Sequence, residues 1–170
     1  MLLEMKVSGL TIDPITNTPI VILKDLQESK AIPIWIGLFE ASAIATELEH
    51  VVFSRPMTHD LMHEFLKALD VAVSRIEIVD IRNNTFFATV YLVRDGQTYR
   101  IDARPSDALA LAVRAHCPMF VAESVFKKCP ELLKPISEDE VKKFREELKN
   151  MKPEDFFRDL KKGKNPPPSE

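Results

Sequence analysis

Two short segments of this 170-residue chain place an arginine, a proline, a hydroxyl side chain and a carboxylate in the same order. Residues 55–60 read Arg-Pro-Met-Thr-His-Asp, and residues 104–107 read Arg-Pro-Ser-Asp. Both segments stand where the hydrophobic pattern predicts that a helix begins. The free N–H groups of a helix N-terminus attract phosphate, and the planar arginine fork is suited to it. The repeated pattern therefore indicates a site for phosphate or a carboxylate.

The acids and the histidine of these segments predict phosphodiester cleavage. Asp60, Asp102 and Asp107 are oxygen ligands of the kind that Mg²⁺ or Mn²⁺ prefers. His59 can move a proton near neutral pH. A metal, a base and an arginine clamp together make up a phosphodiesterase set. The predicted catalytic residues are His59, Asp60, Asp102, Asp107 and Glu40, and the predicted substrate-binding residues are Arg55, Arg104, Thr58, Ser106 and Trp35.

Glu40 and Trp35 come from a second strand-to-helix junction. Residues 40–45 (Glu-Ala-Ser-Ala-Ile-Ala) resemble residues 107–112 (Asp-Ala-Leu-Ala-Leu-Ala), so Glu40 matches Asp107 as an acid in a first helical turn. Trp35 precedes this helix, and its aromatic face can stack on a nucleobase. The internal similarity predicts two similar strand–helix units packed on one sheet.

The same residues also have a purely structural interpretation. Thr58 and Ser106 can cap helices, the aspartates can complement helix dipoles, and the arginines can pair with them. Two other functions follow from this interpretation. One is a non-catalytic module that forms a homodimer through exposed aromatics and the strand edge near Pro33. The other is a sensor in which the helix N-termini hold a small anion.

Hydrophobic periodicity predicts an α+β fold with a mixed or antiparallel sheet. The expected strands are 3–8, 20–23, 31–36, 71–82, 85–94, 97–103 and 119–122, and the expected helices are 38–52, 58–69 and 106–116. Pro33 lacks a donor N–H, so the third strand should lie at an edge or carry a bulge. The predicted buried face of the helix over 58–69 consists of Leu61, Phe65, Leu66 and Leu69.

Charge separates the chain into parts. Residues 1–126 hold 11 basic and 16 acidic side chains, whereas residues 127–164 hold 12 basic and 9 acidic ones. We expect a main domain over 1–128, a charged helical extension over 129–163 and a disordered tail over 164–170. A net charge of −3 excludes nucleic-acid binding by bulk charge alone, although the basic extension can guide a phosphate backbone.

Composition excludes several classes of protein. Two cysteines are too few for a disulfide framework, and the four glycines form neither a dinucleotide fingerprint nor a P-loop, so no organic cofactor is expected. No apolar run reaches membrane-spanning length, and the first residues do not form a signal peptide. These features predict a cytoplasmic protein without a membrane partner. Scarce Asn and Gln beside abundant Ile, Val, Glu and Lys indicate a thermophilic source.

Four ordered blocks resemble the signature of the bifunctional nuclease domain family. They are residues 32–37 (Ile-Pro-Ile-Trp-Ile-Gly), 40–41 (Glu-Ala), 55–61 (Arg-Pro-Met-Thr-His-Asp-Leu) and 101–108 (Ile-Asp-Ala-Arg-Pro-Ser-Asp-Ala). The resemblance covers about residues 1–128. It implies a compact α+β domain and, as in some members, nuclease activity on both RNA and DNA.

Overall fold

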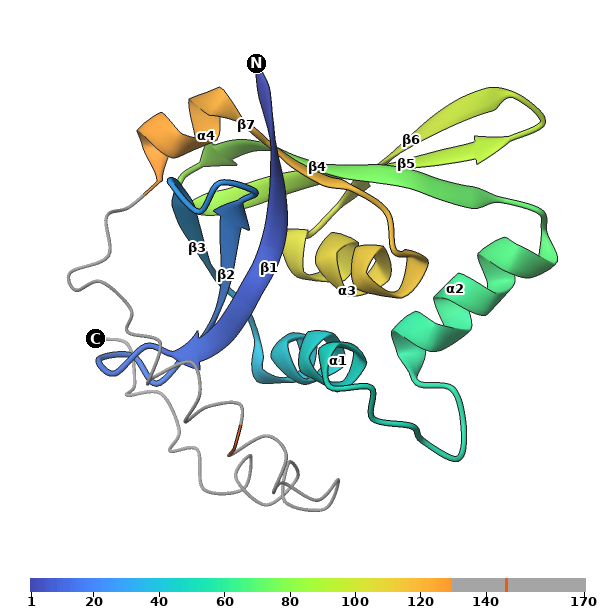
Figure 1. Ribbon diagram of the computed structural model, residues 1–170, viewed down its shortest axis with the longest axis horizontal. Coiled ribbons are helices and arrows are strands. Elements are labelled where there is room, and N and C mark those ends of the chain that lie inside the picture. The colour runs from blue at the N-terminus through green and yellow to red at the C-terminus, as the bar shows by residue number, and fades with distance from the viewer. Residues whose placement is uncertain (130–145, 147–170) are drawn as a thin grey trace, which may run out of the picture.

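Seven strands form one mixed sheet in the computed structural model, which describes residues 1–129 and 146 (Figure 1). The strands are β1 (Leu2–Ile12), β2 (Pro19–Asp25), β3 (Ala31–Trp35), β4 (Ala72–Arg82), β5 (Thr85–Arg94), β6 (Gln97–Ala103) and β7 (Met119–Ala122). Their order is β3-β2-β1-β7-β4-β5-β6. All neighbours are antiparallel except β4 and β7, which are parallel. The predicted α+β class is confirmed, and β3 with its Pro33 is an edge strand, as expected.

The sheet contains two units of the same order, each with three antiparallel strands followed by a helix. In the first, β1, β2 and β3 lead into α1 (Leu38–Leu48), and in the second, β4, β5 and β6 lead into α3 (Pro105–Ala115). The short strand β7 lies between them, paired with β1 on one side and β4 on the other. This arrangement confirms the two similar strand–helix units that the internal similarity predicted.

Two further helices complete the described part of the chain. Helix α2 (Thr58–Ala68) packs beside α3, and α4 (Glu123–Lys128), which the sequence did not predict, packs against β4 and β7. In Figure 1, α1, α2 and α3 lie below the sheet and α4 lies above it. No helix among the described residues is long and apolar enough to cross a membrane. Most of the charged helical extension predicted over 129–163, and all of the tail predicted over 164–170, lie outside the described residues.

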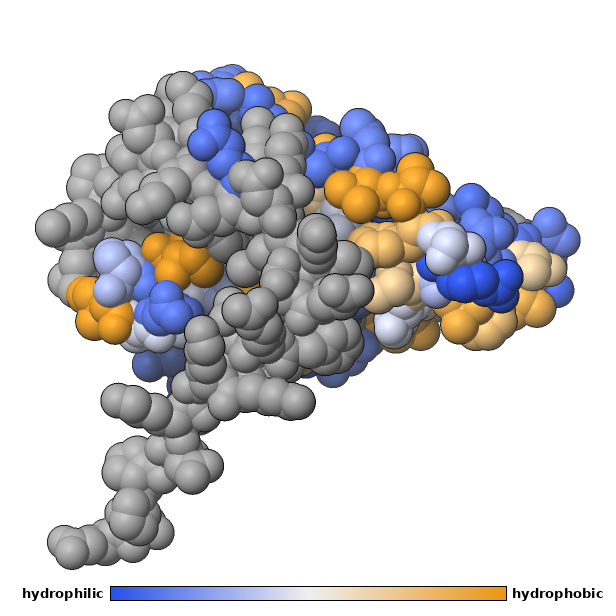
Figure 2. Space-filling model, turned by 90° about the horizontal axis from the view of Figure 1, so that it is seen from below, coloured by the Kyte–Doolittle hydropathy of each residue, from blue (hydrophilic) through white to orange (hydrophobic). Residues whose placement is uncertain are grey.

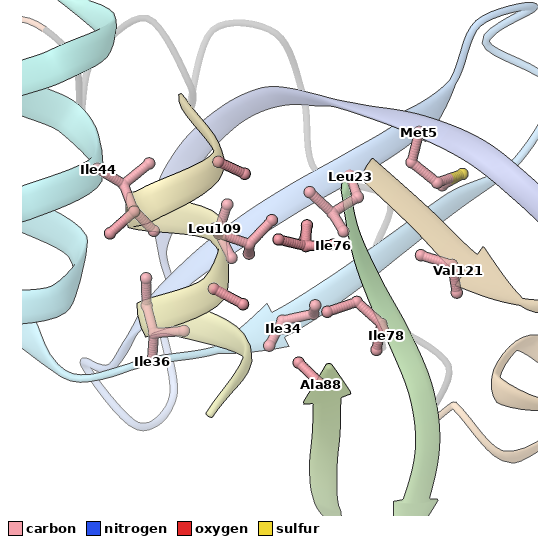
Figure 3. Packing of buried hydrophobic residues seen from close by; sticks show 14 of the residues in the cluster. Met5, Leu23, Ile34, Ile36, Ile44, Ile76, Ile78, Ala88, Leu109 and Val121 are labelled. Atoms are coloured by element: carbon pink, nitrogen blue, oxygen red, sulfur yellow. The ribbon is translucent and has the colours of Figure 1, made fainter. Parts of the chain in front are cut away.

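Helix α3 is the centre of the core. All but two of its eleven residues are buried, because it lies between the sheet and α1. Leu109 is fully buried, as are Ile44 of α1 and Ile76 of β4, and these side chains converge in Figure 3. Burying one such side chain contributes about 1.5–3 kcal/mol. The small alanines of α3 let α1 approach closely, so the N-terminal turns of the two helices come together.

Helix α2 corrects the sequence prediction most clearly. Of the four residues expected to form its buried face, Leu61, Phe65 and Leu69 are exposed and only Leu66 packs against the core. The most buried side chain of α2 is instead that of His59. The predicted position of the helix is confirmed, but its apolar side, which was predicted to be buried, faces solvent.

The helix expected over 38–52 ends earlier, at Leu48. His50 adopts a left-handed conformation with φ of 53°, which an α-helix does not continue through. Val52, the last residue of the predicted range, is 92% exposed in the loop before α2.

Candidate active site

The three helices below the sheet begin in the same way. None of their N-cap residues, Gly37, Met57 and Arg104, makes a side-chain capping bond. Each helix instead carries a carboxylate at its third position. These carboxylates are Glu40 in α1, Asp60 in α2 and Asp107 in α3.

The N-cap prediction for the hydroxyl residues is wrong for both helices. Thr58 is the first residue of α2, and Ser106 is the second residue of α3. The N–H of Met57 donates to Asp60 Oδ2 at 2.8 Å, so a carboxylate three residues on does the capping in α2. Pro105 occupies the first position of α3, where its missing N–H costs no helical hydrogen bond.

The N-terminal turns of α2 and α3 meet through a histidine–aspartate contact. His59 Nε2 lies 3.2 Å from Asp107 Oδ1, although the two residues are 48 positions apart in the sequence. Burial opposes ionisation of Asp107, but bonds from Arg104 and His59 outweigh it and lower the pKa of this carboxyl below its usual value. Asp107 is therefore ionised at neutral pH and can only accept. The shared proton then belongs to His59 Nε2, which leaves Nδ1 as the basic atom of a neutral ring.

Arg104 joins this contact to α1. Its Nε and Nη2 donate to Asp107 at 2.6 and 2.9 Å, and its Nη1 donates to Glu40 Oε1 at 3.0 Å. The two acids that the internal similarity matched thus share one arginine. We call His59, Asp107, Arg104 and Glu40 the His59 cluster.

Arg104 remains open to solvent while it makes these bonds, with 66% of its side chain exposed. A guanidinium carries five N–H donors, and the three bonds to Asp107 and Glu40 leave two for a ligand. The bond to Asp107 also raises the pKa of Arg104 above its usual value. The exposed side of the cluster is therefore a fixed cation whose remaining N–H groups can donate to a phosphate oxygen.

The absence of a side chain at Gly37 leaves room for the carboxylate of Glu40. The Glu40 side chain folds back over the start of α1, and a Cβ added at Gly37 would overlap Glu40 Oε2. Glycine at the N-cap thus leaves the space through which the carboxylate reaches Arg104.

Asp60 follows His59 in sequence but belongs to a different contact. Its Oδ1 accepts from Arg114 Nε at 2.6 Å, and Arg114 Nη1 also donates to the carbonyls of Ala43 and Ala110. Burial opposes ionisation of Asp60, yet the bonds from Arg114 and from the Met57 N–H lower the pKa of this carboxyl. Arg114 is only 5% exposed, so this pair joins α1, α2 and α3 inside the protein.

Sequence reasoning missed Arg114. It is the one charged residue in the otherwise apolar and small stretch from Ala108 to Ala115. A buried arginine requires a carboxylate partner, so its position in that stretch was an available signal.

The other predicted residues do not join the His59 cluster. Asp102 pairs with Thr89 across β5 and β6, and strand alternation points it to the sheet face opposite Ala103, which packs on the core. Trp35 Nε1 donates to Asp13 Oδ2 at 2.9 Å, which ties this side chain to the turn after β1. The remaining three are Arg55 and Thr58, which are exposed, and Ser106, which is buried.

The three aspartates do not fit a metal centre as the structure places them. Asp60 is bonded to Arg114, Asp107 to Arg104 and His59, and Asp102 lies on the other sheet face. Within residues 1–129 and at 146, no three His, Cys, Asp or Glu side chains form a group that could hold a metal ion. The described residues thus bring together a base, its orienting acid and an arginine, without a ligand set for Mg²⁺ or Mn²⁺.

Comparison with known proteins places the chain in a family. The sequence profile of the bifunctional nuclease domain matches residues 21–133, which includes every member of the His59 cluster. Uncharacterized proteins of two Mycobacterium tuberculosis strains, CDC 1551 and H37Rv, are 35% identical over 162 residues, covering 90% of this chain and 97% of theirs. Bifunctional nuclease 1 of Oryza sativa subsp. japonica is 24% identical over 93 residues, which cover 53% of this chain and 28% of the rice protein.

Proposed function

The chain belongs to the bifunctional nuclease domain family, and from this premise we propose that it cleaves phosphodiester bonds of RNA or DNA at the His59 cluster. The observation that carries the proposal is the contact between His59 and Asp107. It brings together the two arginine–proline segments, each of which holds a group needed for phosphoryl chemistry. Separate locations would have left the cleavage reaction without a site.

The geometry assigns a role to each member of the cluster. Asp107 orients the imidazole and keeps its proton on Nε2, so that His59 Nδ1 can take a proton from the attacking hydroxyl or water. Arg104 binds the phosphate through its two remaining N–H donors and neutralises charge that develops on the phosphate oxygens. Glu40 holds Arg104 from the α1 side.

A nuclease assay with labelled single-stranded RNA and DNA tests this function. Asp107→Asn keeps the shape of the side chain but removes the charge that orients His59, and we expect it to reduce cleavage by about 10²-fold or more. Asp95→Asn is the matched control, because Asp95 lies at the exposed tip of the β5–β6 hairpin. Cleavage by Asp107→Asn at the wild-type rate would indicate a contaminating nuclease and overturn the proposal.

The same assay with EDTA tests the predicted requirement for Mg²⁺ or Mn²⁺. Metal dependence stays a prediction, as does a cytoplasmic location. Loss of cleavage in EDTA with recovery on adding Mg²⁺ would place a metal in the reaction. Unchanged cleavage in EDTA would leave the chemistry to the side chains of the His59 cluster.

One observation favours a second candidate function, a non-catalytic homodimeric binding module. Arg104 is already held by Asp107 and Glu40, as expected of an arginine that fixes a helix junction. In that case the protein would not cut RNA or DNA, whether or not it binds them. Binding measured by fluorescence anisotropy, together with the cleavage assay, separates the two functions.

A further inference from the structure

Helix α2 is packed with its apolar side outward. The side toward α3 holds His59, Asp60 and Leu66. The opposite side holds Leu61, Met62, Phe65 and Leu69, of which Phe65 is 59% and Leu69 57% exposed. An amphipathic helix of a folded domain ordinarily turns its apolar side to the core. The core contacts of α2 are instead largely polar.

The exposed side is a continuous stripe. At 100° per residue, the positions of Thr58, Leu61, Met62, Phe65, Ala68 and Leu69 span about 120° of the helix circumference. Every one of these residues is exposed and none is charged. We call them the α2 stripe. Hydrophobic surface appears on the right-hand part of the view from below, the part that α2 occupies in Figure 1 (Figure 2).

We propose that the α2 stripe is the interface of a homodimer, in which a second copy of this chain packs its own α2 antiparallel across a two-fold axis. This would be the homodimer that the sequence predicted, but formed through α2 rather than through the β3 edge. A two-fold axis places the same surface on both copies, so an uncharged stripe meets an uncharged stripe.

The exposed area is sufficient for such a dimer. Three more apolar side chains are exposed just before the helix, namely Val51, Val52 and Met57. Together with the four large side chains of the stripe they expose about 600 Å² per copy, taking about half of each side chain's surface. Two copies would bury about 1,200 Å², which is within the range of specific protein interfaces. A patch of about 600 Å² is at the upper end of what monomeric proteins expose, and patches of that size commonly mark interaction sites.

The charges of α2 favour a second copy of the chain over nucleic acid. On the helical wheel Glu64 borders the stripe, about 40° from Ala68, whereas Lys67 lies about 100° from the nearest edge of the stripe. Glu64 and Lys67 pair with each other at 3.0 Å. Lys67 is the single lysine or arginine of α2, and Glu64 already neutralises it. A nucleic-acid backbone would therefore find little to bind on this surface.

Sedimentation equilibrium of the full chain tests the proposal. The wild-type protein is expected to have the mass of two chains at micromolar concentration, rather than 19.4 kDa. Phe65→Glu places a charge at the centre of the stripe, and we expect it to raise the dimer dissociation constant by at least about 30-fold. Ile15→Glu is the matched control, because Ile15 is an equally apolar, 74% exposed residue in the turn after β1.

The outcomes are distinct from those of the nuclease assay. Dimeric wild type and Ile15→Glu, with a monomeric Phe65→Glu that keeps the circular-dichroism spectrum of the wild type, would support the interface. A wild-type monomer at all concentrations, or a Phe65→Glu variant as dimeric as the wild type, would overturn it. Unchanged mass with lost binding of single-stranded RNA would assign the α2 stripe to nucleic acid and also overturn it.

Discussion

Helix α3 carries an arginine–aspartate pair near each end. The two arginines differ in how exposed they are and in which other groups they bond to. Arg114 at the C-terminal end is buried and bonds to Asp60 and to two backbone carbonyls. Arg104 at the N-terminal end is exposed and bonds to carboxylates alone. The Arg114 side chain is only 5% exposed and so offers a ligand almost no surface, whereas Arg104 can offer two donors to solvent. One pair therefore holds the helices together, and the other is available for a substrate.

The same difference explains why neighbouring residues of α2 have different roles. His59 and Asp60 are adjacent in sequence, yet His59 contacts the exposed pair and Asp60 belongs to the buried pair. The buried pair fixes α2 against α3, and this contact sets the distance between His59 and Asp107. In the proposed nuclease, Asp60 would position α2 and the adjacent His59 would take part in the chemistry.

The largest expected effect comes from removing Arg114. In Arg114→Met the Asp60 carboxylate, 31% exposed, loses its charged partner, and the carbonyls of Ala43 and Ala110 lose the guanidinium donor, so we expect the free energy of unfolding to fall by about 3 kcal/mol. Urea denaturation followed by circular dichroism measures this change. A fall in the free energy of unfolding of less than about 1 kcal/mol is typical of an exposed ion pair. Such a result would show that the Arg114 pair contributes no more to stability than the Arg104 pair.

Removing Arg104 should affect cleavage strongly and stability only slightly. Arg104→Met deletes an exposed pair, so stability should change by less than about 1 kcal/mol. Cleavage should fall by about 10²-fold, because the donor to the phosphate is lost. Arg94→Met, at the exposed end of β5, is the matched control. A stable Arg104→Met variant with full activity would show that Arg104 is only a structural residue.

A smaller effect is expected at Gly37. The Cβ of Gly37→Ala displaces the Glu40 carboxylate and weakens its bond to Arg104, so cleavage should fall by about threefold to tenfold. Combining Gly37→Ala with Glu40→Ala should give no further loss, because both changes act on the same bond. Additive losses in this double-mutant cycle would contradict the role given to Gly37.

The smallest expected effect is a pH dependence of stability. The folded-state pKa of Asp60 lies below its usual value of 3.8, so its ionisation stabilises the protein above that pH and this contribution is lost as the pH falls. Asp60→Asn should therefore flatten the dependence of the unfolding free energy on pH below about pH 4. Equal slopes for Asp60→Asn and the wild type would show that the ionised Asp60 does not contribute through Arg114.

Sequence patterns predicted the sheet and the helix starts because these depend on local chemistry. Strand alternation, the turn residues between β5 and β6, and proline at the start of α3 each act within a few residues. The repeated arginine–proline pattern was the only sequence feature that indicated a contact between His59 and Asp107. Its geometry depends on the packing of α2 against α3.

The sequence failed where a local rule was overruled by tertiary contacts. Leu61, Phe65 and Leu69 have the spacing of a buried face. The polar side of α2 nevertheless faces inward, because Asp60 accepts a bond from Arg114 and His59 contacts Asp107. Periodicity identifies an apolar side without saying what covers it. For a long-range pair such as Asp60–Arg114, 54 residues apart, the local sequence signals only that an arginine lies in an apolar stretch and does not identify its partner.

The most direct test of the central claim is single-turnover cleavage of labelled RNA by His59→Gln beside His63→Gln. Both histidines lie on α2, one turn apart, and glutamine retains a side chain that can bond to Asp107 at position 59. If His59 is the base, His59→Gln lowers the cleavage rate by about 10²–10⁴-fold, while His63→Gln cleaves at nearly the wild-type rate. Equal rates for His59→Gln and the wild type, with both variants folded, would contradict a catalytic role for the His59 cluster.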